Sequence, residues 1–309
     1  MITEELPLSI VIVNYNGKRF LADCLDSIAA QVSCACEVIV VDNASIDGSC
    51  EFLREHYPAI QLLESAVNTG FTGGNNLGAR NARGRILLLL NNDTKLLADI
   101  ALLLREFSDP SLGALGCRLV YGDGKQQYSI GYDHTPLRLV LSWLGLSKLF
   151  GASKWFSRNQ ADDAVYRRAQ REVSWVSGAF LMTPRAVWEK LGGLDEGYFM
   201  YLEDVDYCRR ARDIGCRIAY TPEVDVIHYE GGGKAWIGGK ALNNSMRSYL
   251  WYTAKFHGRM SVLFVRSVLA AVMFCRAAVY GLMSIMSAMT IWKEKRQAYL
   301  LASINLLKR

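Results

Sequence analysis

The feature that most constrains this chain is an alternation of strand-length and helix-length segments over residues 1–121. Short apolar runs rich in β-branched residues predict buried parallel strands, and the segments between them carry helical spacing. We expect strands at residues 8–13, 37–41, 60–63, 85–90 and 113–121, and helices at 18–31, 47–57, 75–83 and 100–107. The alternation predicts βαβ units, and therefore an α/β fold with a mostly parallel sheet flanked by helices.

The rest of the chain is less regular. We expect an irregular loop at 122–172 with one helical segment at 137–150, then a strand at 175–182, helices at 184–191 and 203–214, a strand at 217–220, and helix from 245 to the end. With 309 residues, the chain has room for one large domain and an extension. We predict a domain over 1–232, with halves at 1–121 and 122–232, and a helical extension over 233–309.

Three predicted strands end in polar clusters. These are Asn-Tyr-Asn at 14–16, Asp-Asn-Ala-Ser at 42–45 and Asn-Asn-Asp at 91–93. Ligands of open α/β sheets bind beyond the carboxyl ends of the strands, so the three clusters are expected to share one site.

Two of these clusters hold a carboxylate at a strand end. Asp93 is a candidate ligand for Mg²⁺ or Mn²⁺, which prefer oxygen ligands, and His228 is a candidate second ligand. Asp42 is placed to accept hydrogen bonds from a nucleoside base or ribose. The alternatives are a helix cap for Asp93, a turn residue for Asp42 and a structural role for His228.

Two further motifs indicate ligand chemistry. Residues 68–76 (NTGFTGGNN) read as a loop whose small residues let the backbone approach a phosphate at a helix N-terminus; the alternative is a tight turn. Residues 203–206 (EDVD) open a helix beside an aromatic run. Acids in a first turn are favoured by the helix dipole, but three carboxylates in four residues also suit a general base. Asp204 and Asp206 should face different ways, so at most one of them points at a substrate.

Taken together, these motifs resemble glycosyltransferase family 2. The resemblance rests on SIVIVNYN at 9–16, VVDNAS at 40–45, NTGF at 68–71, LNND at 90–93, SGAF at 177–180, GGLDE at 192–196, FMYLEDVD at 199–206 and VIH at 226–228. The second half resembles the rhamnosyltransferase-like branch, and the match covers about residues 8–232. It implies a GT-A fold, a nucleotide-diphosphate sugar donor and an inverting single displacement.

The resemblance also implies roles for individual residues. Asp204 would be the catalytic base with Glu203 beside it, and Asp93 and His228 would hold the divalent metal. The nucleotide-sugar would contact Asn14, Asn16, Asp42, Asn43, Asn68, Gly70, Phe71, Asn75 and Asn92. The family's Asp-x-Asp metal motif begins here with Asn91, which leaves Asp93 as its one anionic ligand. The Gln-x-x-Arg-Trp motif of processive members is absent, so one sugar should be added per binding event.

The C-terminal segment has its own character. Residues 255–309 hold nine Lys or Arg and one Glu (+8), so the net charge of +5 leaves −3 for residues 1–254. These cations are interleaved with apolar residues, which favours anionic lipid over nucleic acid as a partner. The longest charge-free run, 277–292, has 16 residues, fewer than the ~20 that span a bilayer. We expect a helix lying in the membrane interface; the alternative is packing on the catalytic domain or on a second copy of the chain.

Cysteines and the N-terminus bear on location. None of the eight cysteines forms a Cys-x-x-Cys pair, which favours reduced core thiols over disulfides or zinc. No signal peptide is visible, so a cytoplasmic protein on the inner face of the cell membrane is expected.

The sequence therefore predicts a hexosyltransferase-type enzyme of surface polysaccharide biosynthesis. The donor would be a dTDP- or UDP-sugar, with dTDP-rhamnose suggested by the branch, and the acceptor a saccharide or a polyprenyl-diphosphate-linked saccharide. The alternatives are a nucleotide-sugar-binding protein without activity and a nucleotidyltransferase, although the latter usually has a Gly-rich basic signature that is missing after the first strand.

Overall fold

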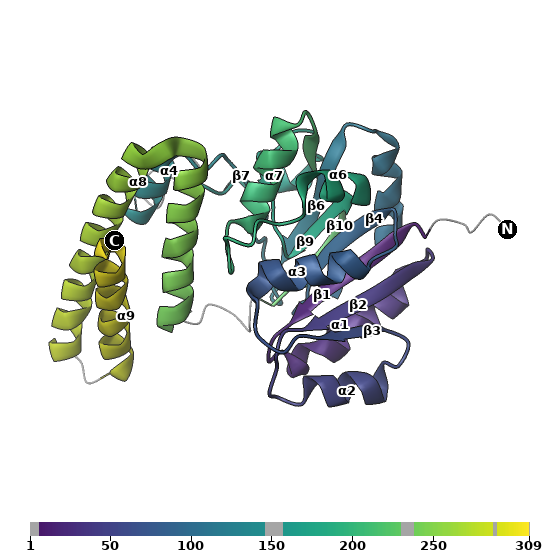
Figure 1. Cartoon of the computed structure of the whole chain (residues 1–309), viewed down its shortest axis with the longest axis horizontal. Coiled ribbons are helices and arrows are strands. Elements are labelled where there is room, and N and C mark those ends of the chain that lie inside the picture. Colours follow the sequence, from purple (N-terminus) through teal and green to yellow (C-terminus); the bar gives the residue numbers. More distant parts are fainter. Residues whose placement is uncertain (1–5, 146–156, 230–237, 287–288, 309) are drawn as a thin grey trace. The chain divides into compact units, whose positions relative to one another are not determined.

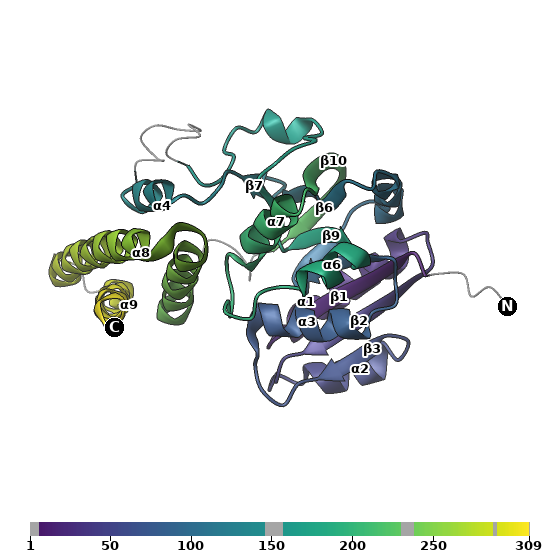
Figure 2. The ribbon, with the colours of Figure 1, turned by 45° about the horizontal axis from the view of Figure 1, so that its top comes forward.

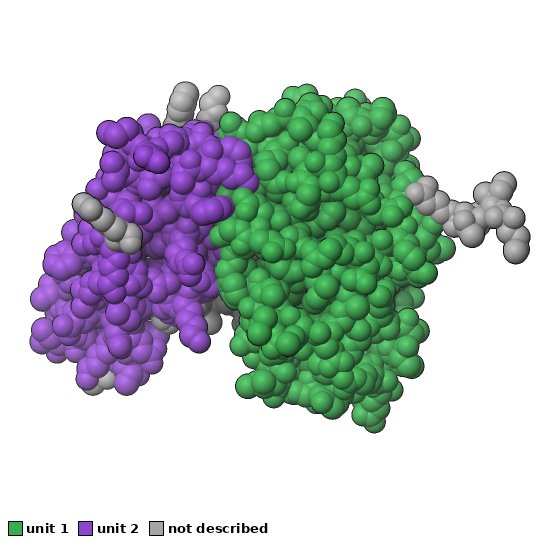
Figure 3. Space-filling model, viewed as in Figure 1, with its two compact units in different colours: residues 1–132, 162–199, 203–233 green, residues 133–161, 200–202, 234–309 purple. Residues whose placement is uncertain are grey.

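The structure is a computed structural model that describes residues 6–145, 157–229, 238–286 and 289–308. It divides into two compact units, coloured separately in Figure 3. The sheet unit comprises residues 1–132, 162–199 and 203–233, and the helical unit comprises 133–161, 200–202 and 234–309. Residues 133–161 thus group with the C-terminal helices, not with the second half of the domain predicted over 1–232.

The sheet unit is built on an eight-stranded sheet (Figure 1). Its strands are β1 (Leu8–Asn14), β2 (Cys36–Asp42), β3 (Gln61–Glu64), β4 (Ile86–Asn91), β5 (Thr94–Leu96), β6 (Leu112–Val120), β9 (Phe180–Pro184) and β10 (Arg217–His228). They lie in the order β3-β2-β1-β4-β9-β6-β10-β5. The first four are parallel, β9 runs antiparallel between β4 and β6, and β5 is antiparallel to β10. The predicted α/β class is confirmed.

Helices cover both faces of the parallel half because its strands are apolar on both sides. The helices of this unit are α1 (Lys18–Gln31), α2 (Ser49–His56), α3 (Gly70–Asn81), α6 (Arg185–Leu191) and α7 (Glu203–Asp213), with 3-10 turns η1 (Ile100–Ser108) and η2 (Val165–Arg167). On one face, Leu21 and Leu25 of α1 join the core around Ile10 and Ile12 of β1. On the other face α3 lies so close to β1 that a Cβ on Gly74 would be 2.7 Å from the Val13 side chain.

Several predicted elements need correction. The helix predicted at 75–83 begins at Gly70, so most of the predicted Gly-rich loop is helical; its glycines serve close packing on β1. The strand predicted at 175–182 is two strands, β8 (Trp175–Val176), paired with β7 (Ile130–Gly131), and β9, because the chain turns at 177–179. The helix at 100–107 is a 3-10 helix, and β10 extends to His228 instead of ending at 220.

The helical unit contains α4 (Pro136–Trp143), α8 (Gly238–Met286) and α9 (Thr290–Leu307). The rest of the helix predicted at 137–150 lies partly outside the described residues. Gly258 has φ 77° and divides α8 into two helical stretches. Beyond it, α8 and α9 pack side by side, as Figures 1 and 2 both show. Their contact uses small and apolar side chains such as Ala270 and Ala302, and the Ser303 hydroxyl donates to the Ala270 carbonyl over 3.0 Å.

Candidate active site

The three polar strand ends meet at one edge of the sheet. The register pairs Asn14 of β1 with Asp42 of β2, and Val13 of β1 with Asn91 of β4. Parallel strands in register carry their carboxyl ends to the same edge, so the expected constellation is present.

A buried hydrogen-bond network joins the first two clusters. The Asn14 amide donates to Asp42 Oδ1 over 2.9 Å and to the Ser45 hydroxyl over 3.2 Å, while Asp42 Oδ2 accepts from the Ser45 N–H. The Asn92 amide then donates to Asn14 Oδ1 over 2.7 Å, which links β4 to β1. Asn14 and Asp42 are almost fully buried, so their orientation is fixed before any ligand arrives.

Gly17 makes room for this network, and sequence reasoning missed it. A Cβ at Gly17 would lie 2.0 Å from the Asn92 amide nitrogen and 2.7 Å from Asn14 Oδ1. Any side chain there would push the start of α1 away from the strand ends. Asn16, one residue earlier, is exposed with φ 51°, and its Oδ1 accepts from the Ile46 N–H.

The other asparagines hold the start of α3. Asn43 Oδ1 accepts from the Thr69 N–H, its amide donates to the Gly70 carbonyl, and Asn68 Oδ1 accepts from the Gly70 N–H. The Asn75 amide donates to the Phe71 carbonyl. These bonds give the predicted nucleotide contacts a local structural role, and the phosphate-binding loop expected here has several of its N–H groups already bonded.

Gly70 joins this region to the segment that leads into α7. Its φ of 76° is left-handed, and a Cβ there would lie 2.1 Å from the Phe199 carbonyl oxygen. The same oxygen accepts from the Phe71 N–H over 2.9 Å. A glycine is therefore required both by the backbone conformation and by the close approach.

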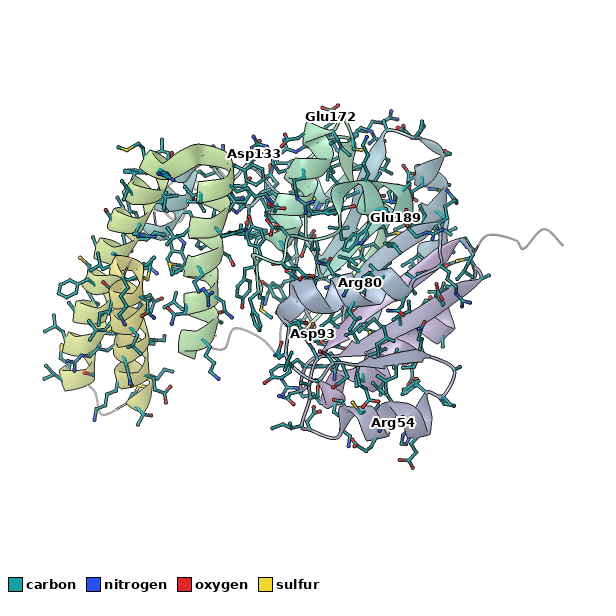
Figure 4. All side chains as sticks on the ribbon, viewed as in Figure 1. Arg54, Arg80, Asp93, Asp133, Glu172 and Glu189 are labelled. Carbon is teal, nitrogen blue, oxygen red and sulfur yellow. The ribbon has the colours of Figure 1, made fainter. Side chains whose placement is uncertain are left out.

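Asp93 and His228 come together at the edge, as the sequence predicted. Asp93 is labelled in Figure 4, just beyond the end of β4. The antiparallel pairing of β10 with β5 places His228 opposite Thr94, and its Nε2 lies 3.3 Å from Asp93 Oδ1. The Asn91 amide is 3.1 Å from the same Nε2, and Gln127 lies against the other ring nitrogen.

The donor atoms of this pair suit a divalent cation. A separation near 3 Å is what two neighbouring ligands of one ion show when each bond is about 2.1 Å. Within the described ranges no cluster of three His, Cys, Asp or Glu could hold a metal. An ion here would therefore complete its shell with ligand phosphates and water, which is usual for Mg²⁺.

The three carboxylates of the EDVD motif divide into one that is engaged in structural bonds and a pair that is not. Asp206 is fully buried and accepts from Tyr198 and Arg210, and Arg210 also donates to the Leu191 and Gly193 carbonyls. Asp206 is thus a structural anchor. This leaves Glu203 and Asp204 as the carboxylates free for chemistry.

Glu203 and Asp204 differ in their surroundings. Asp204 accepts the Gly178 N–H with one oxygen (2.9 Å) and the Val205 N–H with the other (2.8 Å). Burial raises the pKa of Asp204, and these N–H groups oppose the rise. Burial raises the pKa of Glu203 well above its usual range, the negative charge of Asp204 raises it further, and Glu203 Oε2 has no hydrogen-bond partner. Of the two, Asp204 has the N–H donors that stabilise an ionised carboxylate.

Sequence reasoning missed the residues that support the site. Ser45, Gly178 and Gln127 hold Asn14, Asp204 and His228, respectively. Ser45 and Gly178 lie inside recognised motifs, but Gln127 lies in the stretch that has no readable periodicity. All eight cysteines are free; Cys24, Cys117 and Cys208 are buried as expected, whereas Cys275 is exposed.

Comparison with known proteins settles the class. Residues 9–194 match glycosyl transferase family 2, and the chain belongs to this family. Its enzymes transfer sugars, and the chain is a glycosyltransferase of polysaccharide biosynthesis.

Individual relatives are more distant. An N-acetylglucosaminyl-diphospho-decaprenol L-rhamnosyltransferase of Mycobacterium tuberculosis is 29% identical over 74% of this chain and 77% of its own. The low-salt glycan biosynthesis hexosyltransferase Agl10 of Haloferax volcanii is 26% identical over 72% of this chain, which spans 66% of that relative. A mannosyltransferase of Pyrobaculum calidifontis, solved with GDP-Man and Mn²⁺, has a TM-score of 0.58 at 19% identity, over 98% of this chain and 87% of its own. This likeness confirms the GT-A fold.

Proposed function

We propose that the chain performs an inverting, metal-dependent transfer of a single sugar from a nucleotide-diphosphate donor. The observation that carries this is the Asp93–His228 pair, 3.3 Å apart, at the same sheet edge as the buried Asn14–Asp42 network. The Mn²⁺ bound with GDP-Man in the Pyrobaculum mannosyltransferase supports a divalent ion. Such an ion neutralises the charge that develops on the departing nucleoside diphosphate.

The protein's own groups have distinct tasks in this reaction. Asp42, with the amides around it, binds the nucleoside end of the donor, and Asn16, Asn68, Phe71 and the other predicted contacts serve the donor at the same sheet edge. Asp204 takes the proton from the acceptor hydroxyl as the new bond forms. Its two backbone N–H bonds leave each oxygen a further lone pair for that proton. No covalent intermediate is needed, since base and leaving group act on opposite faces of the sugar.

For the donor sugar we propose rhamnose carried by dTDP, with a UDP-sugar as the competing choice. The support is the branch motifs and the name of the Mycobacterium relative. That name also supports a polyprenyl-diphosphate-linked saccharide as acceptor.

A lipid-linked acceptor agrees with the surface of the helical unit. We define its outer apolar surface as the exposed large side chains Met260, Leu263, Phe264, Phe274, Val279, Leu282, Ile285, Met286, Met289, Leu301, Ile304 and Leu307. Arg276, which interrupts the apolar sequence, donates to the Trp143 carbonyl and lies over the Trp143 ring, so it is turned toward α4. Exposed Lys293 and Arg296 follow at the start of α9.

We propose that this surface attaches the protein peripherally to the anionic inner face of the cell membrane. By length and composition alone, α8 is also long and apolar enough to cross a membrane, with a mean hydropathy of 2.0 over its most apolar stretch. An alkaline wash separates the two arrangements, because it releases a peripheral protein and leaves a spanning one in the membrane. Homo-oligomerisation through the same surface is the alternative, and it would appear as a detergent-sensitive dimer.

The central experiment identifies the leaving group. With a panel of dTDP- and UDP-sugars, Mn²⁺ and a polyprenyl-linked acceptor, we expect release of a nucleoside diphosphate. In a parallel reaction with dTTP or UTP and a sugar 1-phosphate, release of pyrophosphate would indicate a nucleotidyltransferase. Neither product in either reaction would indicate a binding protein. A thermal-shift screen with the same nucleotides tests binding alone, because a ligand of the folded state raises the melting temperature. If no nucleotide raises the melting temperature, the proposed donor site is wrong.

A further inference from the structure

The side chain of Gln127 contacts both the imidazole ring and the backbone carbonyl of His228, a residue of the proposed metal site. Its Oε1 lies 2.9 Å from His228 Nδ1, and its Nε2 donates to the His228 carbonyl over 2.5 Å. Gln127 is almost fully buried, and its own N–H donates to the Leu119 carbonyl of β6. The side chain therefore belongs to a fixed part of the sheet unit.

The chemistry of these contacts decides which ring nitrogen carries the proton. A carbonyl oxygen only accepts, so the Gln127 NH₂ group must face the His228 carbonyl. Its Oε1 then faces Nδ1, and Nδ1 must be the protonated nitrogen in order to donate. The lone pair of the neutral ring is left on Nε2, the nitrogen that faces Asp93 Oδ1 at 3.3 Å and the Asn91 amide at 3.1 Å. In the metal-free protein the Asn91 amide donates to that lone pair, and a bound cation would take its place.

We propose that Gln127 is a positioning residue that fixes His228 in the Nδ1–H tautomer, so that Nε2 is available to a divalent cation. The proposal rests on the metal site proposed above. A metal-bound histidine commonly gives its other N–H to a fixed acceptor, and loss of that acceptor costs about 10–100-fold in metal affinity. Gln127 acts through His228 and need not touch the donor sugar.

The first test needs no metal. The chain has four histidines, so a protein labelled with ¹⁵N-histidine gives a simple two-bond ¹H–¹⁵N spectrum, and the His228→Asn variant assigns the His228 signals. We expect the Nδ1–H tautomer in the metal-free protein. An Nε2–H tautomer would overturn the proposal outright, whatever the variants do.

The second test measures Mn²⁺ affinity by electron paramagnetic resonance, with UDP or dTDP present. Gln127→Met removes both hydrogen bonds and should weaken Mn²⁺ binding about 10–100-fold. Gln127→Glu keeps the acceptor for Nδ1–H but loses the donor to the His228 carbonyl, so its Mn²⁺ affinity should fall less than that of Gln127→Met. Gln126→Met is the matched control, because that side chain bonds Arg118 and backbone carbonyls and has no hydrogen bond to His228.

The outcomes separate this inference from the metal site itself. Wild-type protein that binds no Mn²⁺ with either nucleotide overturns the site. Wild-type binding with an unchanged Gln127→Met variant, or with equal losses in the Met and Glu variants, overturns only the role of Gln127. Metal-free melting temperatures show whether each variant is folded, and the wild-type spectrum remains decisive if Gln127→Met is not.

Discussion

The two units differ in which side chains they bury and which they expose. At the carboxyl edge of the sheet unit, Asn14 and Asp42 are buried and bonded to each other, and the half-buried Asn92 donates to Asn14. On the helical unit, large apolar groups such as Leu282 (63% exposed) and Ile285 (83% exposed) face outward. A buried polar network is costly unless it is satisfied, and an extended apolar surface is costly in water. The first unit thus has fixed polar groups for a polar ligand, and the second carries the surface that we propose to contact lipid.

The largest expected effect is at Asp93. Asp93→Ala removes the one anionic ligand of the proposed metal site, so transfer should fall by at least about 10³-fold, since a metal supplies several kcal/mol of charge stabilisation. Product release and Mn²⁺ binding should be lost together. Asp123→Asn, at an exposed turn carboxylate, controls for the lost charge and should behave as wild type. Retained Mn²⁺-dependent activity in Asp93→Ala would contradict the site.

The next effect concerns the base. Asp204→Asn should lower kcat about 10²–10⁴-fold, while donor binding measured by thermal shift stays intact. Because Asp204 must be ionised, kcat/KM should fall as pH falls through its raised pKa. This acidic limb should therefore lie above the ordinary range of an aspartate. Full transfer by Asp204→Asn would move the role of base to Glu203.

The helical unit gives a smaller, graded effect. In the double variant Leu282→Asp and Ile285→Asp, two apolar side chains no longer enter the bilayer, each worth about 1.5–3 kcal/mol when fully buried. Binding to anionic liposomes, measured by flotation, should weaken at least about tenfold. The matched control is Leu102→Asp, at a similarly exposed leucine (51%) of the sheet unit, and it should float as wild type does. If the double variant floated as well as Leu102→Asp, the surface would not bind lipid, and an oligomer would be favoured.

The smallest expected effect concerns stability, and it tests what burying the carboxyls of Glu203 and Asp204 together costs the sheet unit in free energy of unfolding. A carboxyl whose pKa is raised on folding binds protons more readily in the folded state, so stability is lost as pH rises from the unfolded pKa through the folded one. Glu203→Gln removes this loss, because an amide cannot ionise. Its melting temperature should exceed that of wild type at pH 8, by about 2–4 °C per kcal/mol recovered, and the difference should vanish at pH 4. A variant less stable than wild type at both pH values would contradict the raised pKa.

Some elements of the fold and site can be predicted from the sequence, and others cannot. Strands β1, β2 and β4 are predictable because they are continuous apolar runs with a polar end, and the meeting of Asp93 and His228 follows from family motifs. The start of α3 at Gly70 is not, because a run of Gly and Asn has loop composition and only close packing on β1 makes it helical. The antiparallel insertion of β9 and the hydrogen bonds between Gln127 and His228 depend on contacts between distant segments. Such contacts leave no periodic pattern in the local sequence.

Gly70 shows how a long-range contact restricts the residue that one position can hold. Its left-handed backbone and the 2.1 Å approach of the Phe199 carbonyl to a would-be Cβ leave no room for another residue. In a saturation mutagenesis of the chain, position 70 should reject even alanine, although glycine has no side chain that could take part in the chemistry.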